Sequence, residues 1–195
     1  MQNELNRRKF LTSVSMLAAG TLLGNTPLHF GMDRKLKIVM VGTGIRGIGF
    51  WGKRLVKEFS DKLEFVGLCD NNPGRLQYAQ THIGVNCPLY DDFEKMVAET
   101  KPDLVIVTTK DSIHHEFIIK GLEMGCDVLT EKPLTIDEVK CQAILDAERR
   151  SDKKLIVGFN YRWSPYMTKI KQLLSDNAIG KITSVDFNWY LNTYH

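Results

Sequence analysis

Three glycines that directly follow a short apolar run constrain this chain more than any other feature. The run covers residues 36–41 and leads into Gly42-Thr43-Gly44-Ile45-Arg46-Gly47, after which apolar residues recur at helical spacing. A G-x-G-x-x-G motif is weak evidence alone, but between a buried strand and a helix it is typical of a dinucleotide-binding turn. The first glycine permits the turn, the second lets backbone approach a pyrophosphate, and the third lets helix and strand pack closely.

An acidic residue follows where such a unit needs one. A second apolar run, residues 63–69, ends at Asp70. A carboxylate at the end of the second strand can accept hydrogen bonds from both hydroxyls of a ribose, and it repels a 2′-phosphate. The sequence therefore favours NAD over NADP, although Arg75 is near enough to weaken the preference.

Strand and helix patterns alternate along the next hundred residues. Further strands are expected at 103–108, 128–129 and 155–157, and helices at 46–59, from Pro73 onward, at 91–99, 112–124 and 135–150. This alternation predicts an α/β fold, a Rossmann doubly wound parallel sheet with helices on both faces. The predicted nucleotide-binding domain covers residues 34–158.

The pattern changes after this domain. A helix is expected over 164–177, and residues 181–187 alternate with a period of two, which is typical of a strand with two different faces. Because one strand cannot form a sheet alone, we expect residues 159–195 to begin an incomplete α+β second domain with an antiparallel-type sheet.

The N-terminal residues 1–31 have the layout of an export signal. Arg7 and Arg8 form a twin-arginine pair, and a modest apolar run follows at 13–23. This run is too short to span a bilayer, so a twin-arginine signal and linker is predicted, and with it a periplasmic or exported protein. The alternative is a disordered or amphipathic tail. No sharp cleavage site is visible, so membrane contact is expected only through an uncleaved signal.

Charge and cysteine content exclude several classes of protein. The net charge is +3, but basic and acidic residues nearly balance outside the N-terminal 31 residues, so no nucleic-acid partner is expected. The four cysteines form no Cys-x-x-Cys pair and show no metal-ligand spacing, so no metal is expected. Cys69 and Cys126 lie in or beside apolar strand patterns, where core thiols are the better interpretation than a disulfide.

A second glycine motif overlaps the first. Residues 47–54 match most of a P-loop, G-x-x-x-x-G-K, but Arg54 occupies the position where a hydroxyl must bind Mg²⁺. The first glycine of this motif also comes too late after the strand. We therefore interpret it as a coincidence of glycines.

Glu131-Lys132-Pro133 follows the strand at 128–129, at the sheet edge where open α/β folds bind ligands. A lysine there can donate to a ribose or to a substrate hydroxyl, and its cation eases proton loss during oxidation. In isolation the tripeptide would be read as an ordinary exposed loop.

Together with the glycine loop and Asp70, other segments resemble the Gfo/Idh/MocA family, which contains glucose–fructose oxidoreductase and inositol dehydrogenase. These segments are His114, Glu131-Lys132-Pro133 and Gly158-Phe159-Asn160-Tyr161-Arg162. The resemblance implies that Lys132 is catalytic and contacts cofactor and substrate, that Glu131 borders the nicotinamide ribose, and that a cis bond precedes Pro133.

The resemblance also implies further cofactor-binding positions: Thr108, Thr109, His114 and Arg162, with His114 either on the cofactor side or structural. Where the family often has Thr-Pro, this chain has Thr109-Lys110, so the resemblance does not predict the backbone conformation of that loop. The family's other catalytic group, a histidine or aspartate of the second domain, lies beyond residue 195.

The sequence and the resemblance together predict an exported, NAD-dependent oxidoreductase. It would move hydride between nicotinamide and a small sugar, polyol or glycoside, with homo-oligomers as the expected state at full length. Two alternatives stay open. One is an NAD-retaining glycosidase acting by oxidation and elimination, whose members we expect to lack Glu-Lys-Pro, and the other is a non-catalytic nucleotide-binding sensor.

Overall fold

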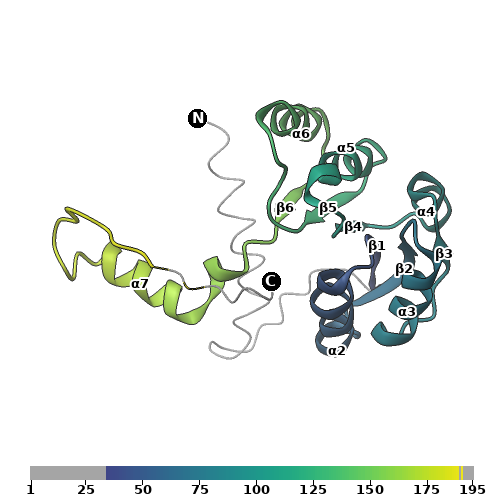
Figure 1. Cartoon of the computed structure of the whole chain (residues 1–195), viewed down its shortest axis with the longest axis horizontal. Helices are drawn as coiled ribbons and strands as arrows, with labels where there is room; N and C mark the ends of the chain where they lie inside the picture. The colour runs from purple at the N-terminus through teal and green to yellow at the C-terminus, as the bar shows by residue number, and fades with distance from the viewer. Residues whose placement is uncertain (1–33, 189, 191–195) are drawn as a thin grey trace. The chain divides into compact units, whose positions relative to one another are not determined.

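The computed structural model describes residues 34–188 and 190, and a six-stranded parallel sheet forms its centre (Figure 1). The strands are β1 (Leu36–Val41), β2 (Leu63–Cys69), β3 (Leu89–Tyr90), β4 (Leu104–Val107), β5 (Asp127–Thr130) and β6 (Leu155–Val157). They lie in the order β3-β2-β1-β4-β5-β6, and all pairings are parallel. The order reverses between β1 and β4, so the crevice for a ligand lies at their carboxyl ends. This confirms the predicted Rossmann sheet.

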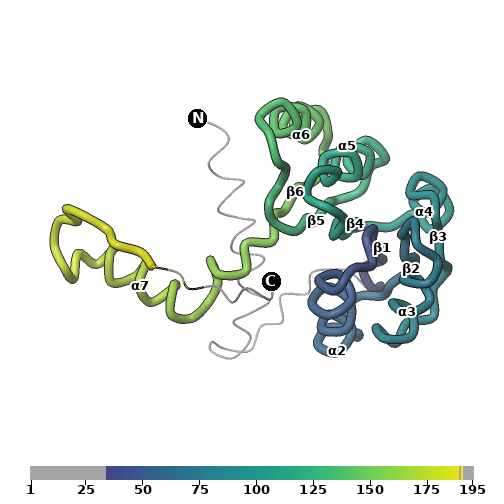
Figure 2. Tube along the Cα trace, viewed as in Figure 1, coloured from purple at the N-terminus to yellow at the C-terminus, as the bar shows by residue number. Residues whose placement is uncertain are grey.

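Helices cover both faces of the sheet (Figure 2). They are η1 (Gly47–Arg54), α2 (Leu55–Phe59), α3 (Pro73–Ile83), α4 (Phe93–Thr100), η2 (Asp111–Ile113), α5 (His114–Glu123), α6 (Glu138–Arg150), η3 (Asn160–Trp163) and α7 (Pro165–Ser175).

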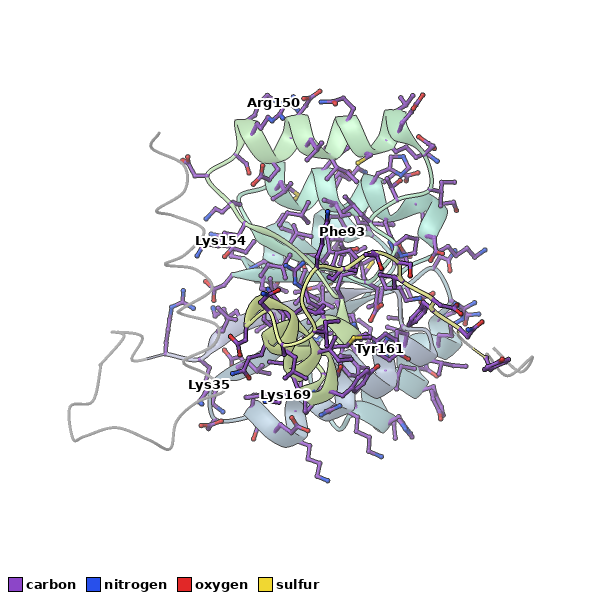
Figure 3. The ribbon with its side chains drawn as sticks, turned by 90° about the vertical axis from the view of Figure 1, so that its left-hand side faces the viewer. Lys35, Phe93, Arg150, Lys154, Tyr161 and Lys169 are labelled. Atoms are coloured by element: carbon purple, nitrogen blue, oxygen red, sulfur yellow. The ribbon has the colours of Figure 1, made fainter. Side chains whose placement is uncertain are left out.

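Strand β1 shows why the sheet needs both layers. Ile38 and Met40 pack against η1 and α3, whereas Val39 and Val41 belong to the core cluster that includes residues of α4, α5 and α6. All four side chains are almost completely buried. A strand buried on both faces has a nearly continuous apolar sequence, and all four residues from 38 to 41 are apolar. Phe93 also lies in this interior, while charged side chains such as those of Arg150 and Lys154 are exposed (Figure 3).

Local capping sets several helix boundaries. Asn72, Asp92 and Asp137 each accept a hydrogen bond from the backbone N–H three residues ahead, at the starts of α3, α4 and α6. Gly125, with φ of 80°, follows α5. The helix expected from residue 135 therefore begins at Glu138, directly after its Asp137 cap.

Two predicted helices differ in detail from the expectation. The helix expected over 46–59 contains a π-helical segment, Gly47–Arg54, before the short α-helix Leu55–Phe59. Residues 47–54, the rejected P-loop, are thus helical. The helix expected over 112–124 begins with the 3₁₀ turn η2 before α5. The two-residue strand β3 was not predicted, because so short a segment shows no periodicity.

The strand predicted at 181–187 is wrong. Residues 181–188 have no regular secondary structure, and the side chains of Ile182, Val185 and Phe187 are exposed. The alternating pattern is present, but a β-strand needs a neighbouring strand to bond its backbone groups. The helix expected over 164–177 is confirmed as α7.

The export signal predicted for residues 1–31 lies outside the described residues. In the described part of the chain, none of the helices combines the length and apolar character needed to cross a membrane.

A surface ion pair ties the first strand to the loop before β4. The Asp103 carboxylate accepts from both terminal nitrogens of Arg34, at 2.6 and 2.7 Å, and from the backbone N–H of Lys37 at 2.8 Å. The Arg34 guanidinium is the main reason that the pKa of Asp103 lies below its ordinary value. A bidentate ion pair whose carboxylate also accepts from a backbone N–H is stronger than a surface ion pair with one hydrogen bond.

We predict that Asp103→Asn lowers the free energy of unfolding by about 1 kcal/mol at neutral pH, a value typical of one lost charged hydrogen-bonding group near the surface. Because the pKa of Asp103 is lowered by folding, this stabilisation is complete above about pH 4 and is lost as pH falls through the lowered pKa. Urea unfolding of wild type and variant at neutral and acidic pH measures the difference. The exposed Asp61→Asn is the control, and a difference that grew on acidification would contradict the assignment.

Candidate functional site

The glycine loop after β1 has the geometry that its sequence predicts. Gly42 has φ of 89°, and a Cβ there would lie 2.6 Å from the backbone of Thr108. A Cβ on Gly47 would lie 2.6 Å from the Gly42 carbonyl oxygen. Gly44 differs, because a Cβ there would meet no atom within 4 Å. The first and third glycines therefore close the turn and pack the helix, and the second faces open space.

Backbone and hydroxyl contacts fix this loop at the seam between β1 and β4. The Thr108 hydroxyl donates to the Gly42 carbonyl oxygen at 2.6 Å, and the N–H of Gly42 donates to the Cys69 carbonyl oxygen at 2.8 Å. Thr108, predicted to touch the cofactor, is in this structure a support of the glycine loop.

Asp70 lies beside the loop, as predicted, and it is almost fully buried. One carboxylate oxygen accepts from the N–H of Thr43 at 2.8 Å and from its hydroxyl at 2.9 Å, and the other accepts from the N–H of Asn72 at 3.0 Å. A carboxylate offers about four acceptor positions, so about one remains for a ribose hydroxyl rather than the two expected. A terminal nitrogen of Arg75 stands 3.9 Å away.

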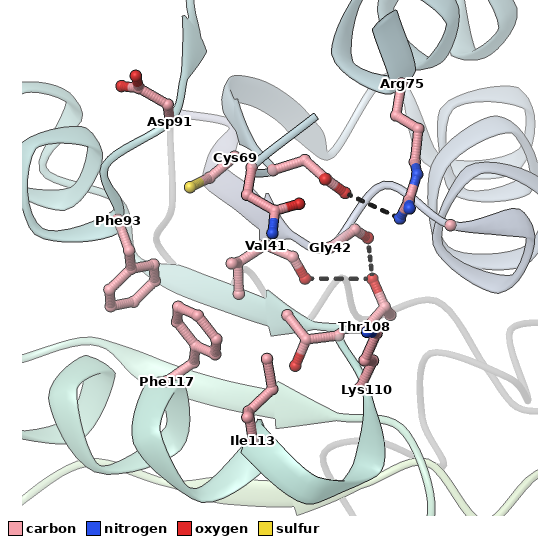
Figure 4. A pocket seen from close by; sticks show the side chains of 14 residues that line it. Val41, Gly42, Cys69, Arg75, Asp91, Phe93, Thr108, Lys110, Ile113 and Phe117 are labelled. Atoms are coloured by element: carbon pink, nitrogen blue, oxygen red, sulfur yellow. Dashed lines mark hydrogen bonds and ion pairs between the residues drawn. The ribbon is translucent and has the colours of Figure 1, made fainter. Parts of the chain in front are cut away.

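A cavity of about 360 Å³ opens at the carboxyl ends of β1, β2 and β4 (Figure 4). Phe93 and Phe117 meet edge to face on one side, and Arg75 and Lys110 supply positive charge. The volume lies within the usual range for small-molecule sites. The lining comprises Val41, Gly42, Gly44, Cys69, Asp70, Asn71, Arg75, Asp91, Phe93, Thr108, Thr109, Lys110, Ile113 and Phe117.

Two observations show that these residues fit a dinucleotide. The space beside Gly44 allows a phosphate to approach the backbone, as the motif requires. The Thr109 hydroxyl is buried in the lining and has no hydrogen-bond partner among the described residues. A ligand group at this point would supply the missing partner.

Several lining residues were not predicted as site residues. Ile113 and Phe117 have helical spacing, which indicates a core residue as readily as a ligand contact, and Phe93 is an apolar residue at the start of α4. Asn71 and Asp91 lie in loops with no recognisable motif. The one usable signal was position, because loops after consecutive parallel strands meet at the same sheet edge.

Lys132 stands in the loop after β5 with an exposed side chain, and its peptide bond to Pro133 is cis, as the resemblance implied. It is not among the residues that line the cavity. Its neighbour Glu131 is buried, and the N–H of Glu131 donates to the Val107 carbonyl oxygen at the end of β4. The loop is therefore anchored in the sheet while the lysine amine reaches solvent.

His114 joins two of the loops. Its ring nitrogens lie 2.9 Å from the Pro133 carbonyl oxygen and 3.1 Å from that of Thr109, and the side chain is buried. It is not in the cavity lining. Of the two interpretations left open, the geometry favours the structural one.

Other predicted positions are also absent from the cavity lining, among them Thr43 and Arg46. Ile45 is 95% exposed, and Arg162, in η3, has an exposed side chain whose guanidinium lies over the ring of Trp163. Neither lines the cavity.

The cysteines of the described chain are free thiols, and most of them are buried. Cys69, Cys87, Cys126 and Cys141 are all free, and the first three are buried. Burial raises the pKa of Cys69, in the cavity wall, to about 12 and that of Cys87 to about 11. These thiols stay protonated at neutral pH and are poor nucleophiles.

Comparison with known proteins identifies the family. Residues 36–159 match the GFO_IDH_MocA model, described as an oxidoreductase family with an NAD-binding Rossmann fold. The chain belongs to this family. The cofactor of the family, NAD, agrees with the cofactor expected from Asp70.

Several relatives and solved structures are similar to the chain. It is 39% identical over 162 residues to the Bacillus subtilis protein YteT, with 81% of this chain and 38% of that protein covered. It is 30% identical over 155 residues to an inositol 2-dehydrogenase/D-chiro-inositol 3-dehydrogenase of Lactiplantibacillus plantarum, with 77% and 44% covered. The chain thus spans about two fifths of the length of these relatives.

Among solved structures, a myo-inositol dehydrogenase from Lactobacillus casei in complex with NAD(H) and myo-inositol superposes with a TM-score of 0.70 at 26% identity, covering 75% of this chain and 43% of that one. A WlbA dehydrogenase from Chromobacterium violaceum in complex with NADH and UDP-GlcNAcA gives 0.70 at 25% identity, covering 82% and 44%.

We predict that Gly44→Ala weakens NAD binding about tenfold or more without lowering the melting temperature. The added methyl meets no protein atom, but it occupies the space that the pyrophosphate needs. Calorimetric titration with NAD and a thermal melt measure the two effects. Gly49→Ala, in η1 and also free of neighbours within 4 Å, is the matched control. Equal NAD affinity in both variants would show that the phosphates lie elsewhere.

Proposed function

We propose that the protein is an NAD-dependent oxidoreductase that transfers hydride between nicotinamide and a hydroxyl-bearing carbon of a sugar, polyol or glycoside. The observation that carries the proposal is the position of Lys132, on an anchored loop after β5, beside the strand end that supplies Thr108 and Thr109 to the nucleotide cavity. When bound, the cofactor supplies the hydride acceptor. Lys132 would hold the substrate hydroxyl and ease the loss of its proton.

Relatives support this class of substrate. They include inositol 2-dehydrogenases and a D-glucoside 3-dehydrogenase of Escherichia coli, 28% identical over 120 residues with 62% of this chain and 34% of that protein covered. Both names describe dehydrogenases, one of an inositol and one of a glucoside.

The proposal is tested with Lys132→Met. Loss of the ammonium group should lower kcat on the best sugar or polyol about 10²- to 10⁴-fold, the usual range for a group that assists proton transfer. NAD affinity should change little, because Lys132 does not line the nucleotide cavity. NADH formation across a panel of polyols, sugars and glycosides gives the first quantity, and calorimetric titration gives the second. Lys110→Met, which removes a lysine from the cavity, should show the opposite pattern.

Other outcomes point to other functions. Release of an aglycone without net NADH formation would indicate a glycosidase that works by oxidation and elimination. NAD binding without turnover on any compound, unchanged in Lys132→Met, would indicate a nucleotide sensor.

We also propose that residues 159–195 belong to a second domain that contributes to substrate binding and to homo-oligomers. Exposed apolar side chains in this segment support the proposal: Tyr166, Ile170, Leu173, Leu174, Ile182, Val185 and Phe187. Apolar surface of this extent is typical of an interface.

Export by the twin-arginine route is the third part of the proposal and rests on Arg7 and Arg8. Replacing both with lysine keeps the charge but removes the pair, and it should abolish appearance of the protein in the periplasm. Immunoblots of cell fractions measure this, with Lys9→Arg as the control. Equal export of the double variant would contradict the assignment.

A further inference from the structure

Glu131 occupies a position that the proposed chemistry leaves unexplained. The resemblance places this carboxylate beside the nicotinamide ribose, yet the structure buries it, 4% exposed, away from the cavity lining. Its bonding partners come from the glycine loop, from helix η1 and from the loop of Lys132.

All of these partners donate to the carboxylate. One oxygen accepts from Nε of Arg46 at 2.6 Å and from the indole N–H of Trp51 at 2.8 Å. The other oxygen accepts from the backbone N–H of Lys132 at 3.1 Å. Hydrogen bonds from charged donors to a buried carboxylate are the strong kind, because solvent competes poorly for them.

We call the hydrogen-bonded group of Glu131, Arg46, Trp51 and the Lys132 N–H the Glu131 junction. Trp51 adds a packing contact to this junction. A Cβ on Gly158 would lie 3.0 Å from the Trp51 ring, so the indole rests directly against the backbone that leaves β6. The ring is buried. Its position therefore depends on the glycine-loop helix, on the Lys132 loop and on the exit from the sheet together.

Arg46 is the member of the junction that reaches solvent. Its side chain is 44% exposed and its guanidinium lies 4.2 Å from the centre of the Phe50 ring. Nε is held by Glu131, and the two terminal nitrogens make no hydrogen bond to the described part of the chain. Arg46 belongs to the glycine loop, although its side chain does not line the cavity itself. Its terminal nitrogens, unbonded among the described residues, can therefore donate to an anion held at that loop.

We propose that Glu131 is a positioning residue that couples occupancy of the phosphate site to the placement of Lys132. An anion that accepts hydrogen bonds from the terminal nitrogens of Arg46 changes the position of the guanidinium. The hydrogen bond from Nε carries this change to the Glu131 carboxylate, which also accepts from the N–H of Lys132. Trp51, bonded to the same oxygen as Arg46, senses the change. This inference rests on the proposed function for the role of Lys132, but the coupling itself is a property of nucleotide binding.

The chain contains a matched pair for comparison. Arg54 lies on the same helix, its guanidinium is also over the Phe50 ring, and its Nε also donates to a glutamate, Glu58, at 2.9 Å. Both members of this second pair are exposed, and among the described residues Glu58 makes no hydrogen bond or ion pair with the Lys132 loop. It reproduces the chemistry of the Arg46–Glu131 pair without the connection.

The decisive variant is Glu131→Gln. The amide oxygen can still accept from Arg46 and Trp51, but the amide NH₂ then faces the N–H of Lys132. Two hydrogen-bond donors then face each other with no acceptor between them, which is unfavourable. The experiment uses protein in which Trp163 and Trp189 are phenylalanine, so that fluorescence reports Trp51 alone. NAD is titrated by calorimetry and by Trp51 emission, and thermal melts establish folding.

In the parent protein, NAD should shift Trp51 emission. In Glu131→Gln we expect this shift to fall to about half or less, NAD affinity to change by about threefold at most, and kcat to fall about 10- to 100-fold, as for a misplaced catalytic group. Arg46→Met should weaken NAD binding about tenfold and abolish the shift. Arg54→Met and Glu58→Gln should match the parent in all three quantities.

Three results would overturn the proposal. A loss of NAD affinity of about tenfold or more in Glu131→Gln, with the emission shift kept, would make Glu131 a direct cofactor ligand. Equal behaviour of Glu131→Gln and Glu58→Gln would remove any coupling. If Glu131→Gln fails to fold, an Arg46→Met variant that keeps the emission shift contradicts the proposal equally. The binding measurements need no turnover, so their failure is distinct from failure of the proposed oxidoreductase activity.

Discussion

The close approach of the glycine loop to the end of β4 is the contact on which the rest of the site depends. At Gly42 and Gly47 the backbone lies so near its neighbours that a Cβ would be within 2.6 Å of them, and the Thr108 hydroxyl bonds across the gap. This contact forms where the strand order reverses, between β1 and β4. Because β1 and β4 are hydrogen-bonded to each other there, the start of helix η1 and the cavity beside it have a fixed position.

Two buried carboxylates also hold loops of the site in place, through hydrogen bonds rather than close backbone packing. Asp70 bonds the N–H and hydroxyl of Thr43 from the β2 side, and Glu131 bonds Arg46 and Trp51 from the β5 side. A buried carboxylate is stable only when donors surround it, so each one fixes the loops that supply those donors. The residues expected to recognise a nucleotide therefore also hold the loop that would bind it.

Sequence reasoning succeeded where a feature is local. Five of the strands and the tight packing at Gly42 and Gly47 follow from apolar runs and glycine conformation, and the structure agrees with them. It failed where a partner was needed. The segment 181–187 has strand periodicity but no neighbouring strand, and the Glu131 junction joins residues 80 or more positions apart in the sequence.

The sequence by itself determined the fold class and the nucleotide-binding loop, because periodicity, glycine spacing and a strand-ending acid are properties of consecutive residues. Only the tertiary structure decided how the individual groups are used. It showed that Asp70 already serves the loop, that His114 bridges two carbonyl oxygens, and that Glu131 faces Arg46 and Trp51. These assignments depend on which strand ends meet at the edge of the sheet, and the sheet brings them together from distant parts of the chain.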